Sequence, residues 1–125
     1  MLQVFKVAII QLYAEPLDAE KNFAKAESFI RSAASQGARL AVLPEYHLSS
    51  WEPEKNGFLE ICGQWQAYLE RYCELARSAK ICIVPGTIVQ REKDPTSGED
   101  RLFNVAYFID DTGRICGEYR KKNLW

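Results

Sequence analysis

The order of apolar and polar positions along the chain predicts a first strand, a helix and a second strand. Apolar residues run almost unbroken over residues 4–12, recur at helical spacing over residues 19–36, and form a short run over residues 40–43. A continuous apolar run is typical of a strand covered on both faces. Asp18 is placed to cap the helix, and Gly37 follows its expected end. This β-α-β order predicts a parallel pair with a right-handed crossover.

The second half of the chain predicts one more helix and three strands. Helical spacing returns over residues 64–80, and residues 81–90 form a strand pattern interrupted by Pro85-Gly86. Residues 91–100 read as a polar loop, and the strand patterns of residues 102–109 and 114–120 flank a turn at residues 110–113. We expect these last three strands to be antiparallel neighbours. Residues 49–63 show no clear period and are expected to be a loop.

The predicted order β-α-β-α-β-β-β is an α/β arrangement, a mixed sheet with helices on one face. Residues 102–109 are apolar at nearly every position, which favours burial on both sides of the sheet. No predicted element remains to cover the second face. We therefore expect that a partner covers it or that the chain is part of something larger.

Composition and charge narrow the class of protein. A length of 125 residues corresponds to at most one domain, and 47% hydrophobic residues are enough for a core. Sixteen basic against seventeen acidic residues give no general attraction to nucleic acid or anionic lipid. The amino-terminal run contains Gln3 and Lys6 and is too short to span a membrane. These features predict a soluble protein that acts on small molecules, with no nucleic-acid or membrane partner.

The cysteines and the single histidine argue against a metal site. Four cysteines lie far apart in the sequence, and His47 is the only histidine, which we expect to be a loop residue. We expect neither a metal nor a cofactor. No secretory signal precedes the cysteines, so we expect a reducing, cytoplasmic location. We expect Cys62, Cys73 and Cys82 to be buried small hydrophobic residues. No Gly-rich phosphate loop follows the first strand, which argues against a flavodoxin-like or nucleotide-binding domain.

Two charged residues, Glu45 and Lys121, each come directly after a strand pattern, where the active sites of open α/β sheets form. Position alone favours an ordinary solvated carboxylate at a strand end for Glu45. Lys122 competes with Lys121, and Arg120 could be a surface residue or an ion-pair partner. Tyr46 and Trp51, near Glu45, could line a substrate pocket or simply pack together.

Several short stretches, taken together and in order, strengthen the interpretation of these two residues. They are Val7–Gln11, Asn22, Gly37-Ala38, Leu43–Glu45, Pro85–Thr87, Phe103–Ala106 with Asp111–Gly113, and Gly117–Lys121. In this order and spacing the chain resembles the first half of a carbon–nitrogen hydrolase of the nitrilase superfamily. The resemblance spans essentially the whole chain, and it selects Lys121 because this lysine directly follows Tyr119-Arg120.

The resemblance implies the N-terminal half of a nitrilase-type α-β-β-α sandwich and a site made of a cysteine nucleophile, a glutamate base and a lysine. Glu45 would take the proton from the thiol, and Lys121 would stabilise the oxyanion. The substrate would be an amide or a nitrile, the intermediate a thioester, and the assembly a possible homo-oligomer. Residues 1–125 would be a partial domain that lacks the half holding the nucleophile.

Two points stay open at the level of sequence. Cys116 is the best-placed substitute for the nucleophile, but its odd offset of five residues from Lys121 puts the two side chains on opposite faces of a strand. Asn123 stands where many members of the family carry histidine. The alternative to an enzyme is therefore a catalytically inactive truncated fragment or an interaction module.

Overall fold

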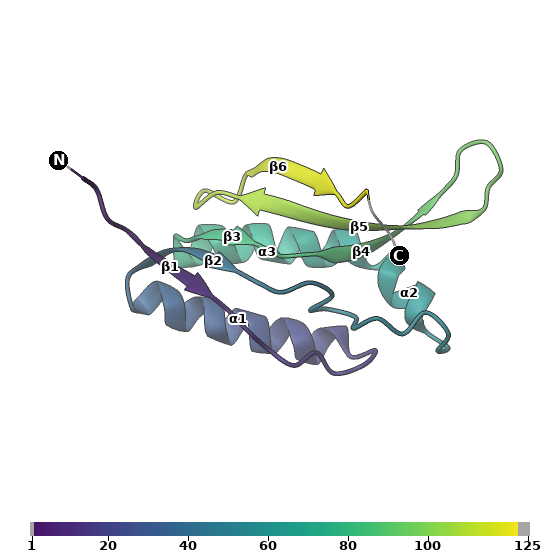
Figure 1. Cartoon of the computed structure of the whole chain (residues 1–125), viewed down its shortest axis with the longest axis horizontal. Helices are drawn as coiled ribbons and strands as arrows, with labels where there is room; N and C mark the ends of the chain where they lie inside the picture. Colours follow the sequence, from purple (N-terminus) through teal and green to yellow (C-terminus); the bar gives the residue numbers. More distant parts are fainter. Residues whose placement is uncertain (1, 123–125) are drawn as a thin grey trace.

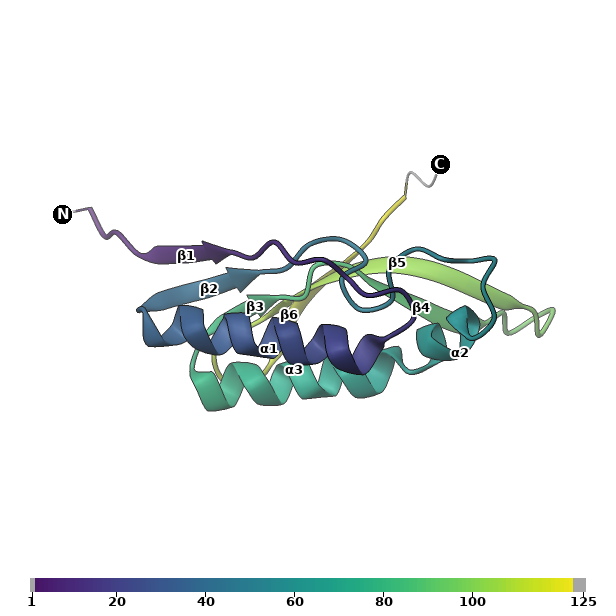
Figure 2. The ribbon, with the colours of Figure 1, turned by 90° about the horizontal axis from the view of Figure 1, so that it is seen from below.

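The computed structural model describes residues 2–122 and contains one mixed sheet with its two long helices on a single face (Figures 1 and 2). The elements in chain order are β1 (Lys6–Ile9), α1 (Ala19–Ser35), β2 (Ala38–Val42), α2 (Phe58–Gly63), α3 (Trp65–Ala79), β3 (Cys82–Val84), β4 (Ile88–Lys93), β5 (Asp100–Ile109) and β6 (Ile115–Arg120). The predicted α/β class and the placement of the helices are confirmed.

The sheet combines a parallel half and an antiparallel half. β1 pairs with β2 and β2 with β3 in parallel, whereas β5 is antiparallel to β3, β4 and β6. Ile109 of β5 lies opposite both Ile83 of β3 and Ile115 of β6, so these strands take opposite edges of β5. Val105 lies opposite Ile88 of β4 and is likewise paired with β6. β3 and β4 therefore follow one another along the same edge of β5.

α1 begins and ends where local chemistry predicts, and α3 ends at a left-handed residue. The Asp18 side chain accepts a hydrogen bond from the backbone amide of Lys21 at 3.1 Å, which satisfies a free donor at the start of α1. Gly37 follows α1 with φ at 86°, a conformation that glycine adopts readily. Lys80 ends α3 in the left-handed region, and its amide bonds back to Ala76.

The core lies between the sheet and α1 with α3. Ala41 of β2 and Ile83 of β3 are fully buried there, in register with each other. Side chains alternate along a strand, so the residues next to Ala41 and Ile83 in their strands point to the other face. Ile9, Val42 and Val84, which are also in register, therefore lie on the opposite face.

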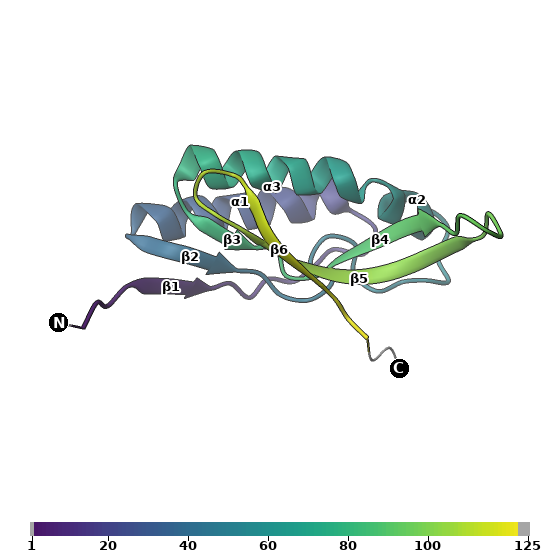
Figure 3. The ribbon, with the colours of Figure 1, turned by 90° about the horizontal axis from the view of Figure 1, so that it is seen from above.

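That opposite face, which we call the open face, carries neither of the two long helices (Figure 3). It is apolar, with exposed fractions of 80% for Ile9, 60% for Tyr119 and 39% for Phe108. Within residues 2–122 the long helices cover one side of β1 and β5 only, so the expectation that a partner or a larger protein covers the other side stays a prediction. An apolar surface of this kind is typical of an interaction site.

Three segments differ from the sequence-based expectation. β1 is shorter than residues 4–12, because only residues 6–9 have β2 beside them. The expected loop at residues 49–63 contains the short helix α2. The expected loop at residues 91–100 is only residues 94–99, because Lys93 pairs with Asp100 on the ladder and Arg91 forms an ion pair with Asp100 at 2.7 Å.

All four cysteines are free thiols. Among residues 2–122, no group of three or more metal-ligating side chains comes together, and no helix is both long and apolar enough to cross a membrane. The expectations of a cytoplasmic location and of a homo-oligomer stay predictions.

Candidate active site

The structure brings Glu45 and Lys121 into direct contact. Glu45 lies in the turn after β2, in the parallel half of the sheet. Lys121 directly follows β6, in the antiparallel half. Lys121 Nζ lies 2.7 Å from Glu45 Oε1, although the two residues are 76 positions apart in the sequence. The exposed fractions of the two side chains are 30% for Lys121 and 42% for Glu45, so a small molecule can reach both. The pair can supply a proton acceptor and a cation to one reacting group.

Asn104 of β5 contacts both members of this pair. Its Nδ2 donates to the same Glu45 oxygen, Oε1, at 2.9 Å, and its backbone carbonyl accepts from the Lys121 amide at 2.9 Å. Asn104 lies on the same face of β5 as Phe108, four residues away, and so on the open face. The three side chains therefore meet on the open face, beyond the carboxyl end of β2.

A close backbone contact fixes the turn that carries Glu45. The break between β3 and β4 places Gly86 against the end of β2, where an added Cβ would lie 1.8 Å from the carbonyl oxygen of Leu43. Only glycine fits such a contact. Next to it, Thr87 Oγ1 accepts a hydrogen bond from the amide of Tyr46, which has a positive φ of 57°. The Pro85-Gly86 break thus aligns the segment that precedes Glu45.

We expect Gly86→Ala to lower the free energy of unfolding by about 2–4 kcal/mol, because the added methyl group must push the backbone of Leu43 away. Urea unfolding of the chain followed by circular dichroism checks this. Gly98→Ala is a control, because nothing lies within 4 Å of an added Cβ there and only its positive φ opposes the change. Equal losses in both variants would contradict a contact-specific role for Gly86.

His47 anchors the same turn to α3. Its Nδ1 lies 3.1 Å from the Pro44 carbonyl oxygen, which can only accept, so Nδ1 carries the proton. Nε2 then accepts from the Tyr72 hydroxyl at 2.9 Å. His47 is 1% exposed, and its burial lowers its pKa to about 4, against smaller opposite effects of the Pro44 and Thr87 backbone. The imidazole is therefore a neutral structural link beside Glu45.

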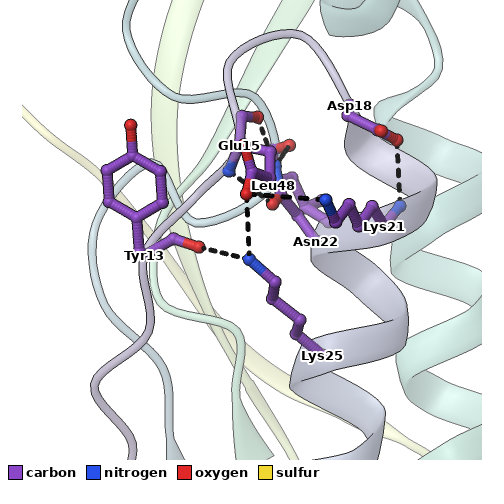
Figure 4. Close-up of polar contacts among 7 residues, drawn as sticks. All are labelled: Tyr13, Glu15, Asp18, Lys21, Asn22, Lys25 and Leu48. Atoms are coloured by element: carbon purple, nitrogen blue, oxygen red, sulfur yellow. Dashed lines mark hydrogen bonds and ion pairs between the residues drawn. The ribbon is translucent and has the colours of Figure 1, made fainter.

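Asn22 binds the backbone of Leu48, three residues after Glu45 (Figure 4). From α1, its Nδ2 donates to the carbonyl oxygens of Leu48 at 2.7 Å and Glu15 at 2.9 Å, and its Oδ1 accepts from the Glu15 amide at 2.7 Å. The side chain is fully buried and its hydrogen-bonding capacity is used at every atom. Asn22 thus ties the loop after β1 to the loop that follows Glu45.

Three aromatic rings pack together in the loop that follows Glu45. The ring of Tyr46 stacks on Trp51 at 5.2 Å, and Trp51 meets Phe58 of α2 edge to face at 5.5 Å. Burial, with a smaller contribution from the charge of Glu45, raises the pKa of Tyr46, which keeps its hydroxyl neutral. Of the two interpretations of Tyr46 and Trp51, the structure shows the packing.

The other charged or nucleophilic candidates lie elsewhere. Arg120 forms an ion pair with Glu92 at 3.0 Å. Cys116 Sγ points to Asp110 Oδ2 at 3.4 Å, in the turn before β6, and burial and this carboxylate raise its pKa. Lys122 is exposed and forms no ion pair within residues 2–122. Asn123 lies outside the described residues.

The comparisons with known proteins define the family. The sequence profile described as carbon-nitrogen hydrolase matches residues 6–125, so the chain belongs to that family. A nitrilase of Pyrococcus abyssi is 36% identical over 126 residues, which cover 96% of this chain and 44% of the relative. The NitFhit protein of C. elegans has a TM-score of 0.80 at 29% identity, over 95% of this chain and 28% of its own.

A third protein is similar in fold. This is an amidase from Nesterenkonia sp. AN1, described with acrylamide added at its active-site cysteine, with a TM-score of 0.77 at 24% identity. The match covers 98% of this chain and 46% of the amidase. The chain therefore spans less than half the length of each of these three proteins, and its sheet with helices is part of their fold.

Sequence reasoning singled out Glu45 and Lys121 but not the residues that hold them. Asn104 entered only as one position of a matched stretch, and His47 was expected to be a plain loop residue. A polar amide within the apolar run of residues 102–109 was the available signal for Asn104. No pattern in the sequence indicated that His47 meets Tyr72, 25 positions away.

Proposed function

We propose that this chain carries the general base and the oxyanion-binding cation of a hydrolase that acts on the carbon–nitrogen bond of a small amide or nitrile. The single observation that supports this most is the 2.7 Å contact between Lys121 Nζ and Glu45 Oε1, with both side chains partly open to solvent. Membership of the carbon-nitrogen hydrolase family points to the same class of reaction.

The proposed chemistry with an amide starts from a cysteine thiol. Glu45 takes the thiol proton, the sulfur attacks the carbonyl carbon, and the charge that develops on the oxygen is stabilised by Lys121. The carbon–nitrogen bond then breaks as the proton passes from Glu45 to the leaving nitrogen, and a thioester remains. Glu45 next takes a proton from water, which attacks the thioester, and the free acid leaves as the thiol regains its proton.

We place the origin of that thiol outside residues 1–125. Burial raises the pKa of Cys62 to about 12 and also raises the pKa of Cys73. Cys116 points to Asp110, in the turn before β6. None of these three is suited to act as a thiolate beside Glu45. Cys82 lies opposite Leu40 at the start of β3, away from the turn that carries Glu45. The apolar open face, on which Asn104 and Glu45 meet, is the surface that a second layer carrying the cysteine would cover, and this chain would be a partial domain.

A chimera tests the proposal. This chain would replace the matching segment of the Pyrococcus abyssi nitrilase, which supplies the remainder of a homologous protein. We expect the purified chimera to hydrolyse a substrate of the parent nitrilase, and the chain alone to be inactive. Lys121→Met should lower kcat/KM by about 10²-fold, whereas Lys122→Met should leave it near that of the chimera. A folded but inactive chimera would argue against the proposal.

The second candidate is a non-catalytic interaction module, favoured by the exposed apolar face. Incubating the chain alone with simple amides and a thiol-reactive probe separates the two ideas. The raised pKa values of Cys62, Cys73 and Cys116 predict slow labelling of these three thiols at pH 7. We expect no turnover by the chain alone. Rapid labelling of one cysteine together with turnover would instead place the nucleophile within this chain.

A further inference from the structure

The geometry points to Asn104 as a positioning residue that selects which oxygen of Glu45 acts as the base. This inference rests on the proposed function. Lys121 Nζ and Asn104 Nδ2 both donate to Glu45 Oε1, at 2.7 and 2.9 Å. Within residues 2–122, Oε2 of the same carboxylate accepts no hydrogen bond, so it is the oxygen available to take a proton.

Two donors on one carboxylate oxygen also fix the plane of the carboxylate. Lys121 has a long, flexible side chain and can follow Glu45 as it moves. Asn104 has a short side chain on a central strand, β5, which is paired on both edges. Its amide therefore sets the orientation of Glu45 relative to the sheet. Through its backbone carbonyl it holds the amide of Lys121 as well, so that a single residue positions both members of the pair.

The unpaired half of the Asn104 amide supports a functional reason for the residue. Asn104 is 5% exposed, and its Oδ1 is buried without a hydrogen-bond partner among the described residues. A buried polar atom without a partner costs free energy, and an apolar side chain would avoid that cost. The amide faces Glu45 with its donor side, since the reverse orientation would set two acceptors against each other. The unpaired Oδ1 of Asn104 thus lowers the folding stability of the chain, while its Nδ2 provides the contact with Glu45.

Gln90 offers a matched control on the adjacent strand. It is 2% exposed, lies on β4 and, like Asn104, carries a buried amide that directly follows two apolar residues. It points to the helix side of the sheet, where the Tyr107 hydroxyl donates to its Oε1. Its replacement leaves a buried hydroxyl without an acceptor, whereas replacement of Asn104 removes an acceptor that already lacks a donor. The two amides therefore make opposite predictions for stability.

The experiment compares Asn104→Leu with Gln90→Leu. In urea unfolding of the chain, we expect a lower midpoint for Gln90→Leu and a midpoint no lower than that of the parent for Asn104→Leu. In the chimera, Asn104→Leu should lower kcat by about 10²-fold with KM changed by less than about twofold. A fall of the midpoint in Asn104→Leu as large as in Gln90→Leu, or an unchanged kcat, would overturn the inference.

A measurement on the chain alone separates this inference from the proposed function. We expect the two side-chain amide protons of Asn104 to give well-separated resonances in NMR spectra, because only one donates to a carboxylate, and we expect this separation to shrink in Glu45→Leu. A shrinking separation with an inactive chimera would keep the positioning role and reject the enzyme. An active chimera, together with Asn104 resonances that are the same in the parent chain and in Glu45→Leu, would reject the positioning role and keep the proposed enzyme.

Discussion

Glu45→Gln in the chimera should lower kcat/KM by about 10³-fold, the typical contribution of a positioned general base. Glutamine has nearly the same shape and can still accept from Lys121 and Asn104 through its one oxygen. What it loses is the ability to take a proton. The loss therefore isolates proton transfer from the packing of the turn, and steady-state hydrolysis with a rapid-mixing search for the acyl intermediate measures it.

The matched control for this variant is Glu52→Gln. Glu52 lies in the same loop, seven residues further along, and pairs with the exposed Lys55 at 3.3 Å. We expect its kcat/KM to stay within a few fold of the chimera's, since surface ion pairs contribute little. Retention of most activity in Glu45→Gln would show that another group accepts the thiol proton.

Acid should destabilise the chain through His47, its only histidine. Burial lowers the pKa of His47 from 6.5 to about 4, so the folded state binds fewer protons than the unfolded state between these values. The free energy of unfolding is then undiminished above pH 6.5 and falls as the pH drops towards 4. A difference of about two and a half pKa units corresponds to roughly 3 kcal/mol.

Urea unfolding between pH 7.5 and 4 tests this in the parent chain and in His47→Gln. The variant should be less stable at pH 7.5, because it loses the link between Tyr72 and the Pro44 carbonyl, but its slope between pH 6.5 and 4 should be smaller. Tyr72→Phe removes one hydrogen bond and keeps the histidine, so it should retain the slope. Equal slopes in the parent chain and in His47→Gln would mean that His47 is not buried as a neutral group.

The local order of the chain followed from short-range chemistry. The Asp18 cap and the Gly37 end of the first helix depend on neighbours within a few residues, and the Pro85-Gly86 break is marked by its residue types; all three are present in the structure. α2 was missed because six residues after a left-handed Gly57 hold no helical period long enough to recognise. The ends of β4 and β5 were missed because cross-strand ion pairs extend strands that their composition alone would end.

The sequence by itself determined the α/β pattern, the family resemblance and the two charged residues at strand ends. Strand runs, helical spacing and motif order are properties of a linear chain. Tertiary structure alone decided that Lys121 reaches Glu45 across the sheet, that Asn104 lies between them and that His47 is a buried link to Tyr72. Those contacts join positions 17 to 76 residues apart, and the pairing of β5 with β6 and the packing of α3 bring them together.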